Sequence, residues 1–376
     1  MKVVIASDSF KGSLSSREVA EAAVRGIRKV LPICELVGVN VADGGEGTVD
    51  AVVEALGGEV VATVVSDPLG RPISACYGTV GKMAIIEMAA ASGLPLLREE
   101  ERNPWLTSTY GTGEMIMDAV KRGCRDFLVG VGGSATNDAG MGMLQALGFR
   151  FYNIDDQEII DGSGGRLQDV ARIDDAGVMD AVRQCRFTVA CDVDTPFCGS
   201  EGAAYVFAPQ KGADMEMVAR LDAGMVAFAK VIEKTYGMDV TSMAGAGAAG
   251  GMGGGFYAFL NARLKRGVDM VLDAIDFDSI IRGADLVITG EGKIDYQTVK
   301  GKTAAGVLAR AKAQDIPVVA IAGRVEMCDS VAQMGFAGVY PIMENEMPLV
   351  VAMQPDFAAA NVEKTVKKIV TNLHIS

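Results

Sequence analysis

Residues 1–31 read MKVVIASDSFKGSLSSREVAEAAVRGIRKVL, and this stretch decides the fold class. Lys2–Ser7 is a short β-branched run, which predicts a buried strand. Ser15-Ser16-Arg17-Glu18 has the spacing of a capping box, and apolar residues then recur at helical intervals until Pro32. A strand, a polar loop and an amphipathic helix in this order predict the first unit of a parallel α/β sheet.

The same alternation recurs along the chain. Further strands are predicted at 36–41, 83–87, 126–131, 187–190, 285–289, 317–322 and 338–342, and further helices at 48–56, 114–122, 214–235, 270–281, 303–313 and 357–373. The C-terminal third, from about Ala284, alternates like the N-terminal part. We therefore predict one discontinuous, Rossmann-like α/β domain from residues 1–78 and 284–376, with a second α/β domain, 79–283, inserted in it. We expect the active site in the cleft between the two domains.

Composition excludes several classes of function. The 376 residues carry a formal charge of −13 without a basic cluster, so nucleic acid is not an expected partner. An anionic ligand must be held locally, by backbone N–H groups, a few cations or a metal ion. The seven cysteines form no C-x-x-C pair, which favours a reducing cytoplasm. The only histidine is His374, so acid–base chemistry falls to carboxylates or lysine.

No stretch of the sequence is expected to enter a membrane. The N-terminal apolar run is too short before Asp8 for a signal peptide. Val240–Ala262 is uncharged and long enough to span a bilayer, but it is crowded with glycine. We interpret it as a glycine-rich loop followed by a buried helix.

Five polar loops follow five of the predicted strands, at the edge of a parallel sheet where ligands bind. They are Asp8–Ser13, Asp43–Thr48, Gly132–Asp138, Cys191–Asp194 and Gly290–Asp295. The first combines a carboxylate, hydroxyls and a lysine before a helix, which suits a phosphate or a carboxylate. The second holds two carboxylates among glycines, which suits Mg²⁺ bridged to phosphate. The third is small and polar, as in loops that cradle phosphate.

Two glycine motifs limit the nucleotide argument. Gly245–Gly250 satisfies G-x-G-x-x-G, but no clear strand precedes it, so a dinucleotide fingerprint is not expected. Gly301-Lys302-Thr303 resembles the end of a P-loop, yet Tyr296 stands where its first glycine should fall. A Walker-type ATPase is therefore disfavoured. From the residues alone we expect a soluble α/β enzyme that handles an anionic, phosphorylated ligand with Mg²⁺. The residues alone do not identify the substrate.

The loops, in their order, resemble the class I glycerate kinases of bacteria. The matching motifs are DSFKGS at 8–13, DGGEGT at 43–48, GGSATND at 132–138, ACDVD at 190–194, PQKGA at 209–213, GAGAAGG at 245–251 and ITGEGKID at 288–295. The resemblance implies two α/β domains, one inserted in the other, and ATP-dependent phosphorylation of D-glycerate to 2-phosphoglycerate. One departure is Ala139, which follows the third loop where glycine is common in the family.

Residue roles follow from this resemblance as hypotheses. Ser9, Lys11, Ser13, Ser134, Asn137, Asp138 and Lys211 are assigned to phosphate or to the substrate, with Lys11 also a catalytic candidate. Asp43, Glu46 and Glu291 are assigned to Mg²⁺, and ATP is the expected phosphate donor. Asp192 is the expected general base, and Asp295 is the second candidate.

Two alternatives remain open at this stage. A kinase of the same fold could act on another small hydroxy acid, and a non-catalytic protein could use the same pocket to sense glycerate or nucleotide. The oligomeric state is also open, and a homo-oligomer is compatible with the sequence.

Overall fold

The computed structural model describes residues 1–343 and 348–375, and the chain divides into two compact units. Unit 1 comprises Met1–Asp43, Asp50–Leu56 and Val268–Ser376, and unit 2 comprises Gly44–Val49 and Gly57–Gly267. One unit is therefore built from both chain ends. The boundaries differ from the expected ones, because residues 44–49 and 57–78 group with the inserted unit and residues 268–283 with the terminal unit.

Unit 1 is built on a parallel five-stranded sheet in the order β14-β13-β12-β1-β2. The strands are β1 (Lys2–Ser7), β2 (Glu35–Asn40), β12 (Leu286–Ile294), β13 (Val318–Val325) and β14 (Gly338–Pro341). All five are predicted from the sequence, although β12 ends five residues later than expected. Strand order reverses between β1 and β12, since β2 lies on one side of β1 and the later strands lie on the other.

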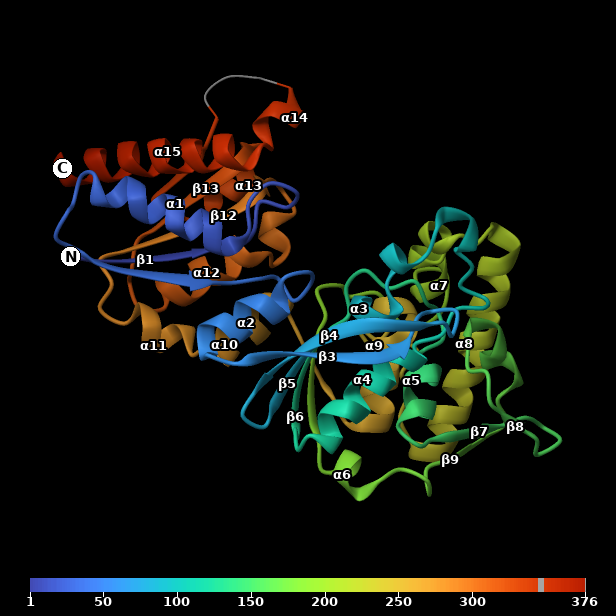
Figure 1. The fold of residues 1–376 in the computed structure, drawn as a ribbon. Helices are drawn as coiled ribbons and strands as arrows, with labels where there is room; N and C mark the ends of the chain where they lie inside the picture. Colours follow the sequence, from blue (N-terminus) through green and yellow to red (C-terminus); the bar gives the residue numbers. More distant parts are fainter. Residues whose placement is uncertain (344–347, 376) are drawn as a thin grey trace. The chain divides into compact units, whose positions relative to one another are not determined.

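Helices cover both faces of this sheet (Figure 1). They are α1 (Ser16–Arg28), α2 (Thr48–Leu56), α10 (Gly267–Ala274), α11 (Phe277–Ile281), α12 (Thr303–Lys312), α13 (Asp329–Gln333), α14 (Leu349–Ala352) and α15 (Pro355–Ile375). One core joins the sheet to α1 and α15, and a second core joins its other face to α10, α11 and α12. The single helix predicted over 270–281 is two helices, because Asp276 adopts a left-handed φ of 53°.

The sequence signals around α1 are confirmed. Glu18 N donates to Ser15 Oγ at 3.2 Å, and Ser15 N donates to Glu18 Oε2 at 2.8 Å, which completes the capping box. The helix then packs closely on α15 at Gly26, where an added Cβ would lie 2.5 Å from the Glu363 carbonyl oxygen. The absence of a side chain at Gly26 therefore lets the two helices approach.

Unit 2 contains a six-stranded sheet in the order β11-β10-β6-β5-β4-β3. Its strands are β3 (Glu59–Ser66), β4 (Pro72–Val80), β5 (Met83–Glu87), β6 (Asp126–Gly130), β10 (Arg186–Ala190) and β11 (Arg263–Lys265). The β3–β4 hairpin and β11 were not predicted. Because β4 pairs antiparallel with β5, the hairpin belongs to this sheet, and this pairing places residues 59–80 in unit 2.

A smaller antiparallel sheet and seven helices complete unit 2. The small sheet holds β7 (Arg150–Tyr152), β8 (Glu158–Ile159) and β9 (Arg172–Asp174). The helices are α3 (Ala89–Ser92), α4 (Tyr110–Lys121), α5 (Met141–Ala146), α6 (Asp180–Arg183), α7 (Ala203–Phe207), α8 (Met215–Tyr236) and α9 (Ala248–Leu260). Their apolar side chains form one large core with the six-stranded sheet.

The glycine-rich stretch before and within α9 is a packing element. Ala249, Gly250 and Gly251 have left-handed backbone angles that interrupt the helix. An added Cβ at Gly250 would lie 2.2 Å from the Thr136 carbonyl oxygen, so the glycine allows close contact with the 132–138 loop. The helical part is buried, as expected, and no helix in the described part of the chain is long and apolar enough to cross a membrane.

Candidate functional site

The first set of candidate residues lies in unit 1, at the carboxyl ends of β1 and β12, where the strand order reverses. Ligands bind at such a reversal in open α/β sheets because the loops on either side diverge there. Ser7 pairs with Gly290, so Asp8 and Glu291, which follow them, are neighbours across the two strands. The loop Asp8–Ser13 then leads from β1 toward α1.

Asp8 and Glu291 are both buried carboxyl groups with raised pKa values. Burial raises the pKa of Asp8, and the negative charge of Asp43 raises it further. Burial likewise raises the pKa of Glu291 to about 6, against the stabilising contacts of Thr298 and Lys302. Two neighbouring buried carboxyl groups with raised pKa values are typical of sites that hold protons or cations.

Specific contacts orient these carboxyl groups. Asp8 Oδ1 accepts a hydrogen bond from Ser9 N at 2.7 Å, and its Oδ2 accepts one from Thr303 Oγ1 at 2.7 Å. Glu291 Oε1 accepts one from Thr298 Oγ1 at 2.7 Å, and its Oε2 lies 3.5 Å from Lys302 Nζ. Residues from two distant segments of unit 1, the loop after β1 and residues 298–303, therefore fix the two side chains.

A pocket of about 950 Å³ opens beside them. Its lining, which we call the unit 1 pocket, comprises Asp8, Ser9, Phe10, Lys11, Ser13, Asp43, Glu291, Gly292, Lys293, Lys302, Gly323, Arg324, Val325, Glu326, Pro341, Ile342, Met343, Leu349, Ala352, Met353 and Ala358. Lys11 Nζ lies 3.4 Å from Asp43 Oδ2. The structure thus brings Ser9, Lys11, Ser13, Asp43 and Glu291 together, in a volume large enough for a nucleotide-sized ligand.

Asp295 lies just beyond the end of β12 and is held as an anion. Burial alone would raise its pKa, but the Lys293 ammonium at 3.0 Å and the Gln297 N–H at 2.8 Å outweigh burial and lower it. A carboxylate with a lowered pKa accepts protons poorly, so these contacts disfavour Asp295 as a general base.

The second set of candidates is a buried polar group in unit 2 that we call the Ser134 cluster, made of Ser134, Thr136, Asn137, Asp138 and Lys211. Lys211 is 1% exposed, and its Nζ donates to Ser134 Oγ at 2.7 Å and to the Thr136 carbonyl oxygen at 2.6 Å. Burial lowers the pKa of Lys211 to about 7, while the nearby charge of Asp138 opposes this shift. Lys211 thus ties the PQKGA motif to the GGSATND loop.

Two polar atoms of the Ser134 cluster have no hydrogen-bond partner among the described residues. They are Thr136 Oγ1 and Asn137 Oδ1, and both are buried. Asn137 Nδ2 contacts the Met225 sulfur at 3.3 Å. Unsatisfied buried oxygens carry a free-energy cost, and an added polar ligand is one way in which such a cost is relieved.

Asp138 has a structural set of contacts. Its carboxylate accepts hydrogen bonds from Thr109 N and Oγ1, at 2.8 and 2.7 Å, and from Gly140 N and Gly142 N, at 3.3 and 3.2 Å. These bonds join the start of α4 to the start of α5. Ala139, which lies between Asp138 and Gly140, has a left-handed φ of 52°. This backbone conformation favours glycine and accounts for the glycine that is common at this position in the resembling motif. We interpret Asp138 as a residue that positions the loop, and its assignment to substrate stays a prediction.

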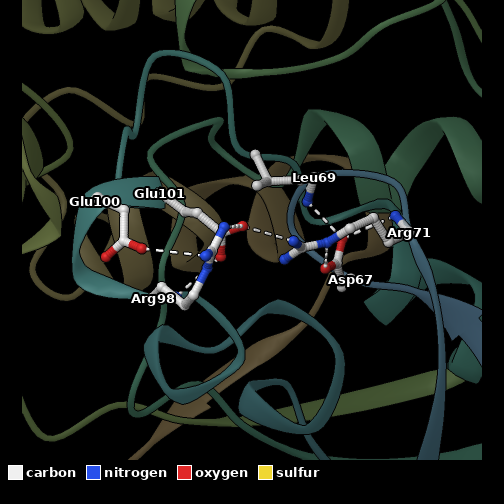
Figure 2. Close-up of polar contacts among 6 residues, drawn as sticks. All are labelled: Asp67, Leu69, Arg71, Arg98, Glu100 and Glu101. Carbon is white, nitrogen blue, oxygen red and sulfur yellow. Dashed lines mark hydrogen bonds and ion pairs between the residues drawn. The ribbon is translucent and has the colours of Figure 1, made fainter.

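The 132–138 loop also rests on a segment that surface ion pairs hold in place. Leu94 N donates to Gly133 O, and Ala135 N donates to Ser92 O, both at 2.9 Å. Figure 2 shows how the next turn is anchored to the β3–β4 connection by the side chains of Asp67, Arg71, Arg98, Glu100 and Glu101. Arg98 and then Arg71 lower the pKa of Glu101 to about 2. This network supports the loop without entering it.

The remaining predicted residues lie in exposed loops of unit 2. Asp192, at the end of β10, is exposed, and its Oδ1 accepts a hydrogen bond from Gly267 N at 2.9 Å. Glu46 is also exposed. Within residues 1–343 and 348–375, no group of three or more His, Cys, Asp or Glu side chains is arranged to hold a metal ion. The metal roles of Asp43, Glu46 and Glu291 therefore stay predictions.

Magnesium is nevertheless compatible with the donors in the unit 1 pocket. Mg²⁺ in kinases is usually held by one or two carboxylates together with phosphate oxygens, so a complete protein cage is not required. Asp8 and Asp43 lie close enough for the charge of one to raise the pKa of the other. These two carboxylates fit a cation that arrives with its phosphate ligand.

Sequence reasoning did not assign Asp8, Thr298, Lys302 or Thr303 to the site. Asp8 was visible as the first residue of its loop, and Lys302 and Thr303 were visible as part of a GKT triplet. No local signal showed that Thr303 bonds to Asp8, because the two residues are 295 positions apart.

Comparisons with known proteins agree with this architecture. The family model described as "Glycerate kinase family" matches residues 3–374. A Bacillus subtilis protein named glycerate kinase is 46% identical over 100% of this chain and 98% of its own. The Escherichia coli glycerate 2-kinase is 45% identical over 91% of both chains. A crystal structure from Salmonella typhimurium LT2 named for glycerate kinase 2 superposes with a TM-score of 0.91 at 43% identity, covering 100% of this chain and 98% of the other. The chain therefore belongs to the glycerate kinase family.

Proposed function

We propose that the protein catalyses the ATP-dependent phosphorylation of D-glycerate, giving 2-phosphoglycerate and ADP. The observation that carries the proposal is the family match over residues 3–374, together with the Escherichia coli relative named glycerate 2-kinase. In this reaction the 2-hydroxyl oxygen of glycerate bonds to the γ-phosphorus, the bond to the ADP oxygen breaks, and the hydroxyl proton passes to a base. Positioning and charge neutralisation provide most of the catalysis in such transfers.

Unit 1 supplies cations and carboxylates to this reaction. We assign Lys11 to phosphate charge, with Ser9 and Ser13 as hydroxyl contacts of the same pocket. Mg²⁺ would neutralise phosphate charge. Asp43 and Glu291 remain our predicted ligands for it, with Asp8 added because its carboxylate lies beside both. Glu46 stays a weaker candidate, because its side chain is exposed.

Unit 2 supplies a small polar site. Glycerate carries a carboxylate and two hydroxyl groups within three carbons, so it needs several donors and acceptors at short range. The Ser134 cluster offers the Ser134 hydroxyl together with the unpartnered oxygens of Thr136 and Asn137. We assign Ser134 and Asn137 to glycerate or to phosphate, and we assign Lys211 to positioning Ser134, because it is buried beneath that side chain.

Asp192 remains the proposed general base. The Gly267 N–H orients its carboxylate, and its exposure leaves the side chain accessible to a ligand. Asp295 is second, since its ion pair with Lys293 weakens it as a base. Both roles concern the removal of the hydroxyl proton, a step worth about 10²–10⁴-fold in rate.

The test is a turnover assay with identification of the product. Purified protein is incubated with ATP, Mg²⁺ and D-glycerate, ADP release is followed, and the product is identified by phosphorus NMR. Formation of 2-phosphoglycerate supports the proposal, whereas 3-phosphoglycerate would retain the kinase and overturn the position of transfer. A parallel panel of small hydroxy acids tests for another acceptor. Ligand-induced stabilisation without any ADP release would instead indicate a sensor. We further propose a cytoplasmic location, in keeping with seven cysteines that form no disulfide.

A further inference from the structure

Gly301-Lys302-Thr303, the GKT triplet, lies at the start of α12, although its spacing from Tyr296 does not fit a P-loop. Strand β12 is followed by a short loop and then by α12, which begins at Thr303 and runs for 10 residues. Lys302 is the N-cap residue, and no side chain caps this helix end among the described contacts. Strand, loop and helix with Lys and Thr at the helix start is the arrangement that P-loop proteins use to bind phosphates. Tyr296 still replaces the first glycine, so the loop itself is different.

Side chains from another strand complete the arrangement. Thr303 Oγ1 donates to Asp8 Oδ2 at 2.7 Å, and Asp8 follows β1, the strand next to β12. A carboxylate beside the hydroxyl of a GKT sequence matches the way in which Mg²⁺ is held next to a nucleotide's phosphates. Lys302 also lies 3.5 Å from Glu291, so its ammonium group is directed toward the same carboxyl pair.

The pocket in front of α12 has features that point to a ligand. The Ser13 hydroxyl oxygen is buried and has no hydrogen-bond partner among the described residues, although Ser13 lines the unit 1 pocket. The same lining holds four cations, Lys11, Lys293, Lys302 and Arg324, and each forms an ion pair with a carboxylate of the lining, Asp43, Glu326 or Glu291. A polyphosphate that arrives with a divalent cation suits such a lining, because it can exchange partners with both the cations and the carboxylates.

Another part of the lining is apolar. It includes Phe10, Ile342, Met343, Leu349 and Met353. Leu349 is 70% exposed, which is unusual for a large aliphatic side chain that lines a pocket. A lining with both apolar and charged side chains suits a ligand that carries both a flat ring and phosphates.

We propose that the unit 1 pocket binds the nucleoside triphosphate, with the polyphosphate at Lys302 and Ser13 and the base against Leu349 and Met353. Thr303 is fully buried and acts behind the pocket, by orienting Asp8. The identity of the nucleotide as ATP rests on the proposed function, but the site for a nucleotide polyphosphate rests on the geometry of unit 1. Asp8 holds the Thr303 hydroxyl and is placed to share a divalent cation with the phosphates. The motif that the sequence analysis set aside is thus assigned to the phosphate donor.

Calorimetric titration of the full chain tests this assignment. The probes are ADP with and without Mg²⁺, inorganic tripolyphosphate, and D-glycerate, each titrated alone. Lys302→Met should weaken ADP and tripolyphosphate binding by about 10- to 100-fold, the size expected for losing a charged hydrogen-bond donor. Binding of D-glycerate should change by less than about twofold. Lys312→Met, which removes the same charge from the other end of α12, is the matched control and should leave every affinity unchanged.

A second pair of variants tests the hydroxyl group. Thr303→Val should abolish most of the gain in ADP affinity that Mg²⁺ provides, and Thr303→Ser should restore it. Unchanged nucleotide binding in Lys302→Met, or a loss of D-glycerate binding in its place, would overturn the assignment. If wild-type protein binds ADP as described but does not phosphorylate glycerate, only the proposed function fails. If it phosphorylates glycerate while Lys302→Met binds nucleotide normally, only this assignment fails.

Discussion

Replacing Lys211 by methionine should change the pH dependence of stability in a defined direction. Lys211 is buried, and burial lowers its pKa from 10.5 to about 7. Above pH 10.5 the group is neutral in both folded and unfolded chains, so the shift has no effect on stability there. As pH falls toward 7, the unfolded chain binds a proton that the folded chain does not, and the folded state loses stability. Methionine cannot titrate, so the variant lacks this loss.

The magnitude follows from linkage. Lowering the pKa of Lys211 by about 3.5 corresponds to about 5 kcal/mol of unfolding free energy, and all of this is lost below pH 7. The unfolding free energy lost in this way falls from about 5 kcal/mol at pH 6 to about 2 kcal/mol at pH 9. As pH rises from 6 to 9, the unfolding free energy of wild-type protein should therefore increase by about 3 kcal/mol relative to that of Lys211→Met. A constant difference, from the Thr136 carbonyl that loses its donor, adds to this at every pH.

The chain offers a convenient probe of this unit. Trp105 is its only tryptophan, and it lies in unit 2 beneath the Arg220 guanidinium, 4.1 Å from the ring centroid. Urea unfolding followed by tryptophan fluorescence at pH 6, 7, 8 and 9 would measure the free energy of both proteins. Lys234→Met, at an exposed lysine on α8, controls for loss of one charge, and Asp138→Asn in both backgrounds removes the titration of the nearest acid. Parallel curves for wild type and Lys211→Met would refute the reasoning.

Three further predictions concern other parts of the molecule. Asp192→Asn should leave the fold and nucleotide affinity intact and lower kcat by about 10²-fold or more, whereas Asp295→Asn should have the smaller effect; steady-state kinetics of both would decide between the two bases. Wild-type protein should lose about 2 kcal/mol of unfolding free energy as pH rises from 4.5 through about 6, because the folded chain holds the Glu291 proton more tightly than the unfolded chain does. Glu291→Gln should remove this loss, and urea titrations followed by circular dichroism measure it. Gly26→Ala should lower the unfolding free energy by about 1–2 kcal/mol, because its Cβ would meet the Glu363 carbonyl, and an unchanged or raised midpoint in thermal unfolding would contradict this close approach.

The part of the fold that could be predicted from the sequence is the part set by local periodicity. Every strand of the unit 1 sheet contains an apolar run, and the capping box at Ser15 marks the start of α1 within one residue. The β3–β4 hairpin was missed because its exposed and buried residues mix, with Val60 and Val64 both exposed on an edge strand. Its pairing with β5 is a tertiary fact, and it moved the domain boundary.

The positions of the candidate loops at strand ends were predicted, because polar loops after parallel strands lie at the edge of a sheet. Their division between two sheets was not predicted: the loops after β1, β2 and β12 follow strands of the unit 1 sheet, and those after β6 and β10 follow strands of the unit 2 sheet. The state of each side chain was not predictable, since it depends on what else is buried there. Asp138 appeared to be a ligand in a phosphate-type loop, yet four hydrogen bonds from the starts of α4 and α5 engage it. Lys211 was expected to contact phosphate or the substrate, and it is buried beneath Ser134.

The GKT triplet shows why a spacing rule and a structure can disagree. The P-loop pattern requires a glycine where Tyr296 stands because the pattern describes a single loop that wraps the phosphates by itself. Here the loop after β1 lines the same pocket, so Ser13 and Asp8 can supply contacts that a continuous loop would otherwise make. The requirement on Tyr296 is therefore relaxed, while the requirements for a lysine and a hydroxyl at the start of the helix remain. The phosphate site that we propose is divided between two neighbouring strands, and a pattern drawn from one chain segment cannot detect a site of that kind.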